Sequence, residues 1–282
     1  VGKLPNMKMN EAEQDSLTYL SAENFFLEED YVQAFNGFKK YVDTYPEGLF
    51  AVEAWRNAAV CAEKNNDREN AKVAYTKISQ LPVPDAEAAT RKLAEMYYAD
   101  KDYKPALGYF RKLDEMAGDQ AVRVAAKVGK MRCLRALGQS KDLVEAALDV
   151  LRQDGVSTQE AEEARYFIAR TAPSIGENEL AMQQYEVLAG SQNSDYSSLA
   201  RYVLLEQRVK AGFHEEAERM IFDYISQASM NEYYLVKTYL LWADIYVKRG
   251  NILQAKQTLQ SIIDNYEGED LKAVAKEKME MI

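Results

Sequence analysis

The sequence predicts an all-α protein built from tandem helix-turn-helix repeats, and two patterns support this fold. A small residue returns every 35 to 38 residues along the chain. About one helix length before each occurrence, apolar residues recur at three- and four-residue steps, which is the spacing of one face of an α-helix. A fixed period of this length is typical of helical repeat arrays.

The small residue marks the second helix of each unit. The clearest copies are DYVQAFNGF from Asp30 and DYKPALGYF from Asp102, which share the pattern Asp-Tyr-x-x-Ala-x-x-x-Phe. In the fourth unit a leucine takes the place of the alanine. The seven positions are Ala34, Ala71, Ala106, Leu143, Ala181, Ala217 and Ala255. We expect a small side chain there because two helices cross closely at this point.

The first helix of each unit precedes this position and is followed by turn-forming residues. Segments such as TYLSAENFF, RKLAEMYYA and YLLWADIYV carry the helical period. Glu29-Asp30, Asn65-Asn66-Asp67, Gly176, Gly212 and Gly250 follow them. An Asp or Asn at the start of the second helix can cap free backbone N–H groups.

These units resemble the tetratricopeptide repeat (TPR). That family has an aromatic residue or Leu early in the first helix, small residues at the helix crossing, Tyr before the second helix, Ala-x-x-x-aromatic within it and Pro after it. The matching residues are Trp55, Ala59, Ala71 and Tyr75 in one unit and Tyr31, Ala34, Phe38 and Pro46 in another. The resemblance implies a right-handed α-α superhelix, a TPR solenoid of about seven repeats and a C-terminal helix. The period is longer than the usual 34 residues, and the fourth unit departs from the pattern.

We expect a single solenoid domain over residues 15–266. Its repeats lie near 15–48, 49–84, 85–118, 119–156, 157–193, 194–230 and 231–266. Residues 1–14 form a lead-in segment. Residues 267–282 form either a capping helix or a truncated eighth repeat, with an apolar face made by Leu271, Val274, Ala275, Met279 and Ile282.

Composition excludes several classes of function. The net charge is −10, which opposes binding to nucleic acid or to an anionic membrane surface. The most apolar stretch, Tyr233–Val247, is interrupted by Lys237 and Asp244 and is too short to span a membrane.

No catalytic motif is present, and we expect no enzymatic activity, no metal and no cofactor. The chain has a single histidine, His214, which we interpret as a packing residue rather than a catalytic one. Cys61 and Cys133 occupy one repeat position that usually holds Ala, so we interpret both as small buried apolar residues. A glycine-rich phosphate loop and a His-Glu-x-x-His motif are both missing.

The resemblance to TPR proteins implies a concave groove lined by the first helices. In the family, the fifth, ninth and twelfth residues of that helix face the ligand. The corresponding residues here are Tyr19, Arg56, Arg91, Tyr166 and Tyr202 at the fifth position, Glu23, Glu95, Arg170 and Glu206 at the ninth, and Tyr98 at the twelfth. Aromatic residues and Arg are enriched at binding hot spots, so a peptide or protein segment is the expected ligand. The alternative is that these residues form an ordinary mixed surface.

We therefore expect an interaction scaffold with a protein or peptide partner. The unit from Ala34 to Pro46 resembles TPR units of bacterial envelope proteins, which favours assembly of an envelope complex and a periplasmic location. The alternative is a sensor or regulatory arm of a larger signalling or transcription-regulating protein, with a cytoplasmic location. The start at Val1 rather than Met indicates a processed protein or an excised fragment. An open solenoid has two exposed ends, so self-association through these ends is a further alternative.

Overall fold

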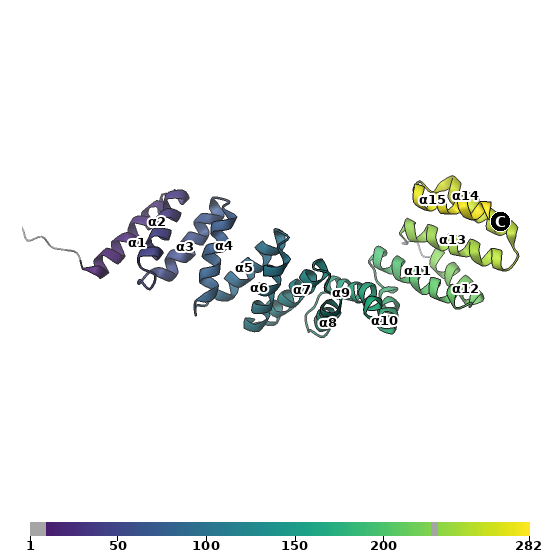
Figure 1. Cartoon of the computed structure of the whole chain (residues 1–282), viewed down its shortest axis with the longest axis horizontal. Helices are drawn as coiled ribbons and strands as arrows, with labels where there is room; N and C mark the ends of the chain where they lie inside the picture. Colours follow the sequence, from purple (N-terminus) through teal and green to yellow (C-terminus); the bar gives the residue numbers. More distant parts are fainter. Residues whose placement is uncertain (1–9, 227–230) are drawn as a thin grey trace, which may run out of the picture. The chain divides into compact units, whose positions relative to one another are not determined.

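The computed structural model describes residues 10–226 and 231–282. These residues form fifteen α-helices and one short 3-10 helix, and no strand occurs among them. They divide into two compact units, one ending at Gly138 and one spanning Gln139–Ile282. In each unit, successive helices pack side by side (Figure 1).

The N-terminal unit contains seven helices within its described residues: α1 (Glu11–Leu27), α2 (Tyr31–Thr44), α3 (Ala51–Lys64), α4 (Arg68–Gln80), α5 (Ala86–Ala99), α6 (Tyr103–Met116) and α7 (Gln120–Ala136). The C-terminal unit contains α8 (Ser140–Leu151), α9 (Thr158–Thr171), η1 (Ala172–Ile175), α10 (Asn178–Leu188), α11 (Ser194–Lys210), α12 (His214–Ile225), α13 (Glu232–Lys248), α14 (Ile252–Asn265) and α15 (Glu269–Glu280).

A left-handed residue ends the first helix of every repeat. These residues have φ between 55° and 85° and lie five positions before each small residue; they are Glu29, Asn66, Lys101, Gly138, Gly176, Gly212 and Gly250. The next N–H then donates back to the last turn of the first helix, as Asp30 N does to the Phe25 carbonyl at 2.9 Å. The seven turns repeat at the intervals of the small residues, the fourth included, which agrees with the predicted count of about seven repeats.

The small positions are buried in all seven second helices. Each of the six alanines is at most 2% exposed, and Leu143 is also 2% exposed. Helices α1 and α2 cross closely, because a Cβ on Gly37 would lie 2.7 Å from that of Ala22. The expectation of a close crossing is therefore confirmed for the first repeat, and Leu143 is buried at the same position of the fourth.

Side-chain caps start some of the helices but not all. Asp30 and Asp67 accept hydrogen bonds from the N–H groups of the third residue of α2 and α4, as expected. Asp102 and Asn251 occupy the equivalent position without a side-chain cap. The capping prediction is thus right for the first two repeats and wrong for these two.

The first helix starts earlier than expected, inside the predicted lead-in. Asn10 caps it by accepting from the Glu13 N–H at 2.8 Å, while the Glu13 carboxylate accepts from the Asn10 N–H at 3.0 Å. This reciprocal capping box is a strong helix start, so α1 begins at Glu11. Residues 1–9 of the lead-in and 227–230 of the sixth repeat lie outside the described residues.

The last helix, α15, packs on α13 and α14 through Leu271 and Ala275, which are 7% and 0% exposed. Lys276, Glu277 and Glu280 on its other side are exposed. A helix with one buried apolar face and one solvated charged face suits the end of a repeat array.

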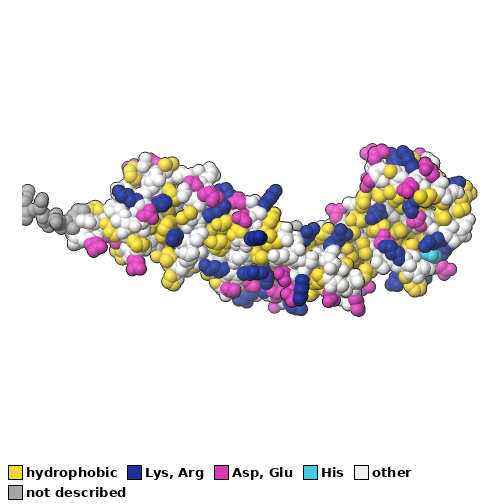
Figure 2. Space-filling view, viewed as in Figure 1, with side chains coloured by type: hydrophobic (Ala, Val, Ile, Leu, Met, Phe, Trp, Pro, Cys, Tyr) yellow, Lys and Arg dark blue, Asp and Glu magenta, His cyan; other side chains and the backbone are white. Residues whose placement is uncertain are grey.

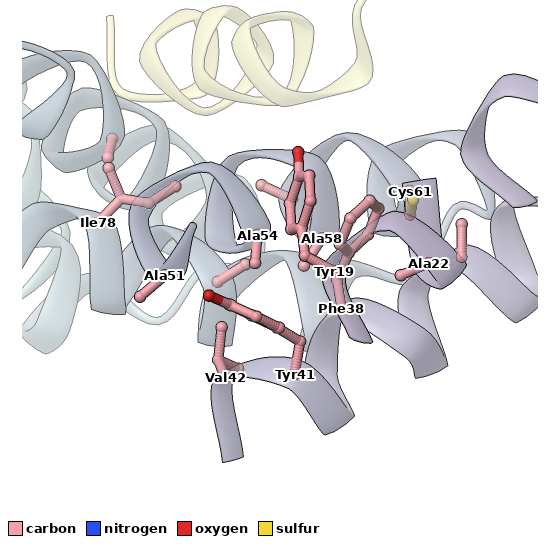
Figure 3. Packing of buried hydrophobic residues seen from close by; sticks show 14 residues of the cluster. Tyr19, Ala22, Phe38, Tyr41, Val42, Ala51, Ala54, Ala58, Cys61 and Ile78 are labelled. Carbon is pink, nitrogen blue, oxygen red and sulfur yellow. The ribbon is translucent and has the colours of Figure 1, made fainter. Parts of the chain in front are cut away.

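The core of the N-terminal unit is rich in aromatic residues. The Tyr19 and Phe38 rings lie 5.6 Å apart between α1 and α2, and the Tyr41 ring lies at the same distance from Tyr19 (Figure 3). Cys61 in α3 lies in the same cluster and is fully buried (Figure 3), as Cys133 is in α7. The interpretation of both cysteines as buried apolar residues is confirmed.

Alkaline pH is expected to destabilise the N-terminal unit. Burial raises the pKa of Tyr19 and of Tyr41 to about 12, whereas an unfolded tyrosine titrates near 10. The unfolded chain therefore loses these protons first, and the stability falls between about pH 10 and pH 12. The loss is on the order of 2 kcal/mol for each tyrosine. Urea unfolding at pH 8, 10 and 11 measures how steeply the free energy of unfolding falls with pH. Tyr41→Phe should reduce this slope. An identical slope in parent and variant would contradict the prediction.

Candidate functional site

The expected groove residues of α1 and α3 are held in contacts within the N-terminal unit. Tyr19 is only 3% exposed, its ring stacks on Phe50 at 4.5 Å, and its hydroxyl accepts from Asn57 Nδ2 at 3.1 Å. The same hydroxyl donates to Glu23 Oε1 at 3.3 Å. The expectation of an exposed tyrosine is wrong at this position, because the loop before α3 and α3 itself cover the ring.

Arg56, also expected to face a ligand, forms ion pairs within the unit. Its guanidinium contacts Glu53 Oε2 at 2.9 Å and the carboxylate of Asp85 at the start of α5. The hydrogen bond with Glu53 raises the pKa of the Arg56 guanidinium above its usual value. Two carboxylates around one half-exposed cation leave Arg56 little net charge for an acidic ligand.

The three candidates on α5, namely Arg91, Glu95 and Tyr98, differ in their surroundings. Tyr98 packs edge-on against Tyr103 and Phe110 at 5.4 Å and 6.5 Å. Arg91 is half-buried, and Glu95 is exposed. Glu95 lines a hollow of about 460 Å³ between α3, α4 and α5, together with charged groups of both signs.

In the C-terminal unit the predicted tyrosines meet others across neighbouring first helices. The rings of Tyr166 on α9 and Tyr196 on α11 stack at 5.0 Å with an interplanar angle of 24°. The rings of Tyr202 on α11 and Tyr234 on α13 lie 6.0 Å apart. We call these four residues the tyrosine cluster. Tyr202 is 8% exposed, so the expectation of an exposed side chain is wrong there, because α13 lies against it. Tyr166, Tyr196 and Tyr234 are half-buried.

Two cations lie on this face. Lys237 Nζ is 4.1 Å from the centroid of the Tyr202 ring and 5.9 Å from that of Tyr234. A cation over aromatic rings is attracted by their electron-rich faces. Arg170 is exposed and hydrogen-bonds Tyr185, and its charge also acts on Tyr234.

Carboxylates complete the face. Glu206 accepts from the Tyr202 hydroxyl at 3.0 Å and pairs with Lys210 at 2.7 Å. Asp244 pairs with Lys278 of α15 at 2.6 Å. Both carboxylates also act electrostatically on Tyr202. Acidic and basic side chains are interspersed over this unit in the view of Figure 2.

The protonation states follow from these neighbours. Burial raises the pKa of Tyr196, Tyr202 and Tyr234, so their hydroxyls stay neutral and can donate hydrogen bonds at neutral pH. Burial alone would raise the pKa of Glu206, but hydrogen bonds from Lys210 and Tyr202 outweigh it and lower the pKa. Glu206 is therefore a carboxylate at neutral pH.

This arrangement suits binding. It offers aromatic rings, hydroxyl donors and two cations on one face. Among the described residues, no group of three or more His, Cys, Asp and Glu side chains could hold a metal. His214 lies at the first residue of α12, outside the tyrosine cluster, and is half-buried. No described helix is long and apolar enough to cross a membrane.

Sequence reasoning missed three residues of this face, namely Tyr196, Tyr234 and Lys237. They lie in the first two turns of α11 and α13, ahead of the fifth position that the family pattern emphasises. Tyr196 precedes Tyr202 by six residues, so the helical period alone does not place them together. Tyr234 connects the two, because it lies against Tyr202 and packs on the same apolar cluster as Tyr166 and Tyr196. Tyrosines near the start of two successive first helices were the signal that could have found them.

The repeated helix pairs, with a left-handed turn at one fixed place, define an α-helical solenoid repeat protein. Residues 237–268, in α13 and α14, match the family model described as tetratricopeptide repeat. This helix pair is therefore a tetratricopeptide repeat, which confirms the predicted family resemblance.

Among solved structures, a tetratricopeptide repeat protein from Parabacteroides merdae is similar, with 14% identity and a TM-score of 0.42 over 97% of this chain and 100% of that one. YrrB, described as a TPR protein with an unusual peptide-binding site, has 16% identity and a TM-score of 0.40 over 60% and 81%. Pseudomonas aeruginosa pilF has 13% identity and a TM-score of 0.39 over 95% and 98%. A comparison with curated proteins finds no match.

Proposed function

We propose that this chain is a non-catalytic interaction scaffold that binds a peptide or protein segment across the tyrosine cluster. The observation that carries the proposal is the joining of tyrosines on α9, α11 and α13 into one face beside Arg170 and Lys237. Repeat proteins use such continuous surfaces for extended ligands.

The chemistry of the face indicates the ligand. Half-buried tyrosine rings provide apolar contact at low entropic cost, and their hydroxyls donate to peptide carbonyls. Arg170 binds a carboxylate through two N–H groups at once, while Lys237 provides a point charge. We therefore propose a segment with at least one Asp or Glu flanked by apolar residues. In the N-terminal unit, Arg91 and Glu95 of α5 are further proposed contacts with the ligand.

Reversing the two cations is expected to weaken binding at least tenfold. Twelve-residue peptides selected from a random library against the whole chain serve as the probe, and fluorescence anisotropy gives each Kd. In Arg170→Glu/Lys237→Glu, both cations that would face a peptide carboxylate are replaced by anions, a loss of about 1.4 kcal/mol or more.

The matched control is Arg219→Glu/Lys256→Glu, which makes the same charge change at exposed positions of α12 and α14. Its Kd should stay within about twofold of the parent value. Equal losses in the two double variants would mean that net charge and not the tyrosine cluster governs binding, and the site would then be wrong.

For the setting, we propose a bacterial envelope complex. The resemblance of the unit from Ala34 to Pro46 to envelope TPR units supports it. Fractionation of the source cells with an antibody to the chain tests this, since recovery in the cytosol alone would favour the regulatory-arm alternative.

A further inference from the structure

The first helix pair exposes an apolar face whose counterpart in the second repeat is buried. Leu17 and Phe25 on α1 are 50% and 38% exposed. They line a hollow of about 410 Å³ between α1 and α2, together with Ser21 and Gly37. Three further apolar side chains of the same pair, Leu20, Leu27 and Val32, are also exposed.

The repeat itself shows what such a face packs against. One period later, Leu17, Ser21 and Phe25 correspond to Ala54, Ala58 and Ala62 of α3, which are at most 1% exposed. Ala54 and Ala58 lie in one cluster with Phe38, Tyr41 and Val42 of α2. A helix placed against α1 as α2 is against α3 would therefore cover the exposed stripe.

The charge around the stripe specifies the helix that fits. Residues 11–44 contain eight acidic residues and two lysines, a formal charge of −6 against −10 for the whole chain. Helix α1 carries no Lys or Arg at all. Glu13 and Glu28 lie one turn before Leu17 and one turn after Phe25, so they flank the stripe on the same side of the helix. Both are exposed.

A second copy of this chain is a poor match. Pairing two α1 helices would bring two acidic surfaces together. Helix α15 is a poor match as well, because its Leu271 and Ala275 are already buried and its exposed positions include Lys276, Glu277 and Glu280.

We propose that the α1–α2 face binds a basic amphipathic helix of a partner protein, in the position that a second helix takes in the internal repeats. Its apolar stripe packs on Leu17, Ser21 and Phe25, and its Lys and Arg side chains meet Glu13 and Glu28. This site is separate from the tyrosine cluster and does not depend on the function proposed for it.

The probe is a fluorescein-labelled 18-residue peptide with Leu and Ala at helical spacing and Lys and Arg elsewhere. Two comparison peptides have the same composition without the stripe, or Glu in place of Lys and Arg. We expect the striped basic peptide to bind the whole chain at least tenfold more tightly than either. Equal binding of the stripeless peptide would overturn the proposal, because it would show attraction by charge alone.

Leu17→Glu/Phe25→Glu should weaken binding of the striped peptide at least tenfold. The substitution adds two negative charges, so non-specific attraction to a basic peptide would become stronger and not weaker. Val187→Glu/Leu253→Glu places the same change at two other exposed apolar positions, 53% and 68% exposed, and should leave the Kd unchanged. Equal losses in the two variants would overturn the proposal.

Two further variants test whether the peptide occupies the hollow between α1 and α2. Ser21→Trp fills the hollow without changing the charge and should also weaken binding tenfold, even if the Leu17 and Phe25 variant unfolds. Arg170→Glu/Lys237→Glu should leave the affinity for this peptide within about twofold of the parent value. Light scattering of the whole chain provides the last test. A dimer that Leu17→Glu dissociates would overturn the proposal in favour of a second copy.

Discussion

Asp15→Ala is expected to lower the free energy of unfolding of the N-terminal unit by about 3 kcal/mol. The Asp15 carboxylate accepts from the Tyr41 hydroxyl at 2.5 Å and from the Leu49 N–H at 3.1 Å. The same Tyr41 hydroxyl accepts from the Phe50 N–H at 3.0 Å. Tyr41 is fully buried, so removal of the carboxylate leaves its hydroxyl without an acceptor. An unsatisfied buried group costs more than the hydrogen bond itself contributes.

This network also directs the chain from α2 into α3, because it holds the backbone of Leu49 and Phe50 just before α3 begins at Ala51. Asp15→Asn retains one acceptor oxygen and should lose less stability than the alanine variant. The control is Asp43→Ala, whose carboxylate is 63% exposed and paired only with Lys39 among the described residues. An exposed pair of this kind contributes about 0.5 kcal/mol or less.

Trp55 provides the signal for this measurement. The chain has two tryptophans, Trp55 in α3 and Trp242 in α13. In a Trp242→Phe background, urea unfolding followed by fluorescence reports on the N-terminal unit. Similar midpoints for the Asp15 and Asp43 variants would show that the network contributes little.

Gly129→Ala is expected to lower the stability of the same unit by about 2 kcal/mol, which is the range for overpacking a core. Gly129 lies in α7 against the ring of Phe110 in α6, and an added Cβ would overlap the ring carbons. Phe110 is 7% exposed and a buried ring has little room to move. The overlap therefore outweighs the gain of about 1 kcal/mol that alanine brings to a helix.

Gly108→Ala is the matched control, and the opposite sign is expected. Gly108 lies inside α6, and an added Cβ there would have no heavy atom within 4 Å. The substitution should therefore raise the stability by up to about 1 kcal/mol. Phe110→Leu should restore part of the stability of Gly129→Ala, because the smaller side chain leaves space for the methyl group. A destabilised Gly108→Ala, or no rescue by Phe110→Leu, would show that overlap with the Phe110 ring is not the cause.

The repeat architecture was readable along the chain because its signals are local. Apolar spacing determines which face of each helix is buried, and Ala34 and its six counterparts mark the crossings. The residue at each left-handed turn keeps the same distance from them, even at Gly138 in the degenerate fourth repeat. Each of these features depends on a few neighbouring residues, so one sequence was sufficient for the helix pairs and their register.

The binding face was less predictable, because exposure at the fifth helical position depends on the neighbouring repeat. Tyr19 and Tyr202 occupy that position, and both are covered by side chains of the next repeat. The family pattern identified Tyr166 and Arg170, but their contacts with Tyr196 and Tyr185 bring together residues 15 to 30 positions apart.

The apolar residues of α1 show the same difference between what local spacing predicts and what packing between helices decides. The helical period predicts that Leu17 and Phe25 share a face with Ser21. Nothing in that period distinguishes them from Ala54 and Ala62, which occupy the same repeat positions and are buried. Packing against a preceding helix makes the difference, since α2 lies on α3 while the face of α1 is exposed. Local spacing thus determined the helices and their apolar faces, whereas contacts between helices distant in sequence decided which faces stay open to a partner.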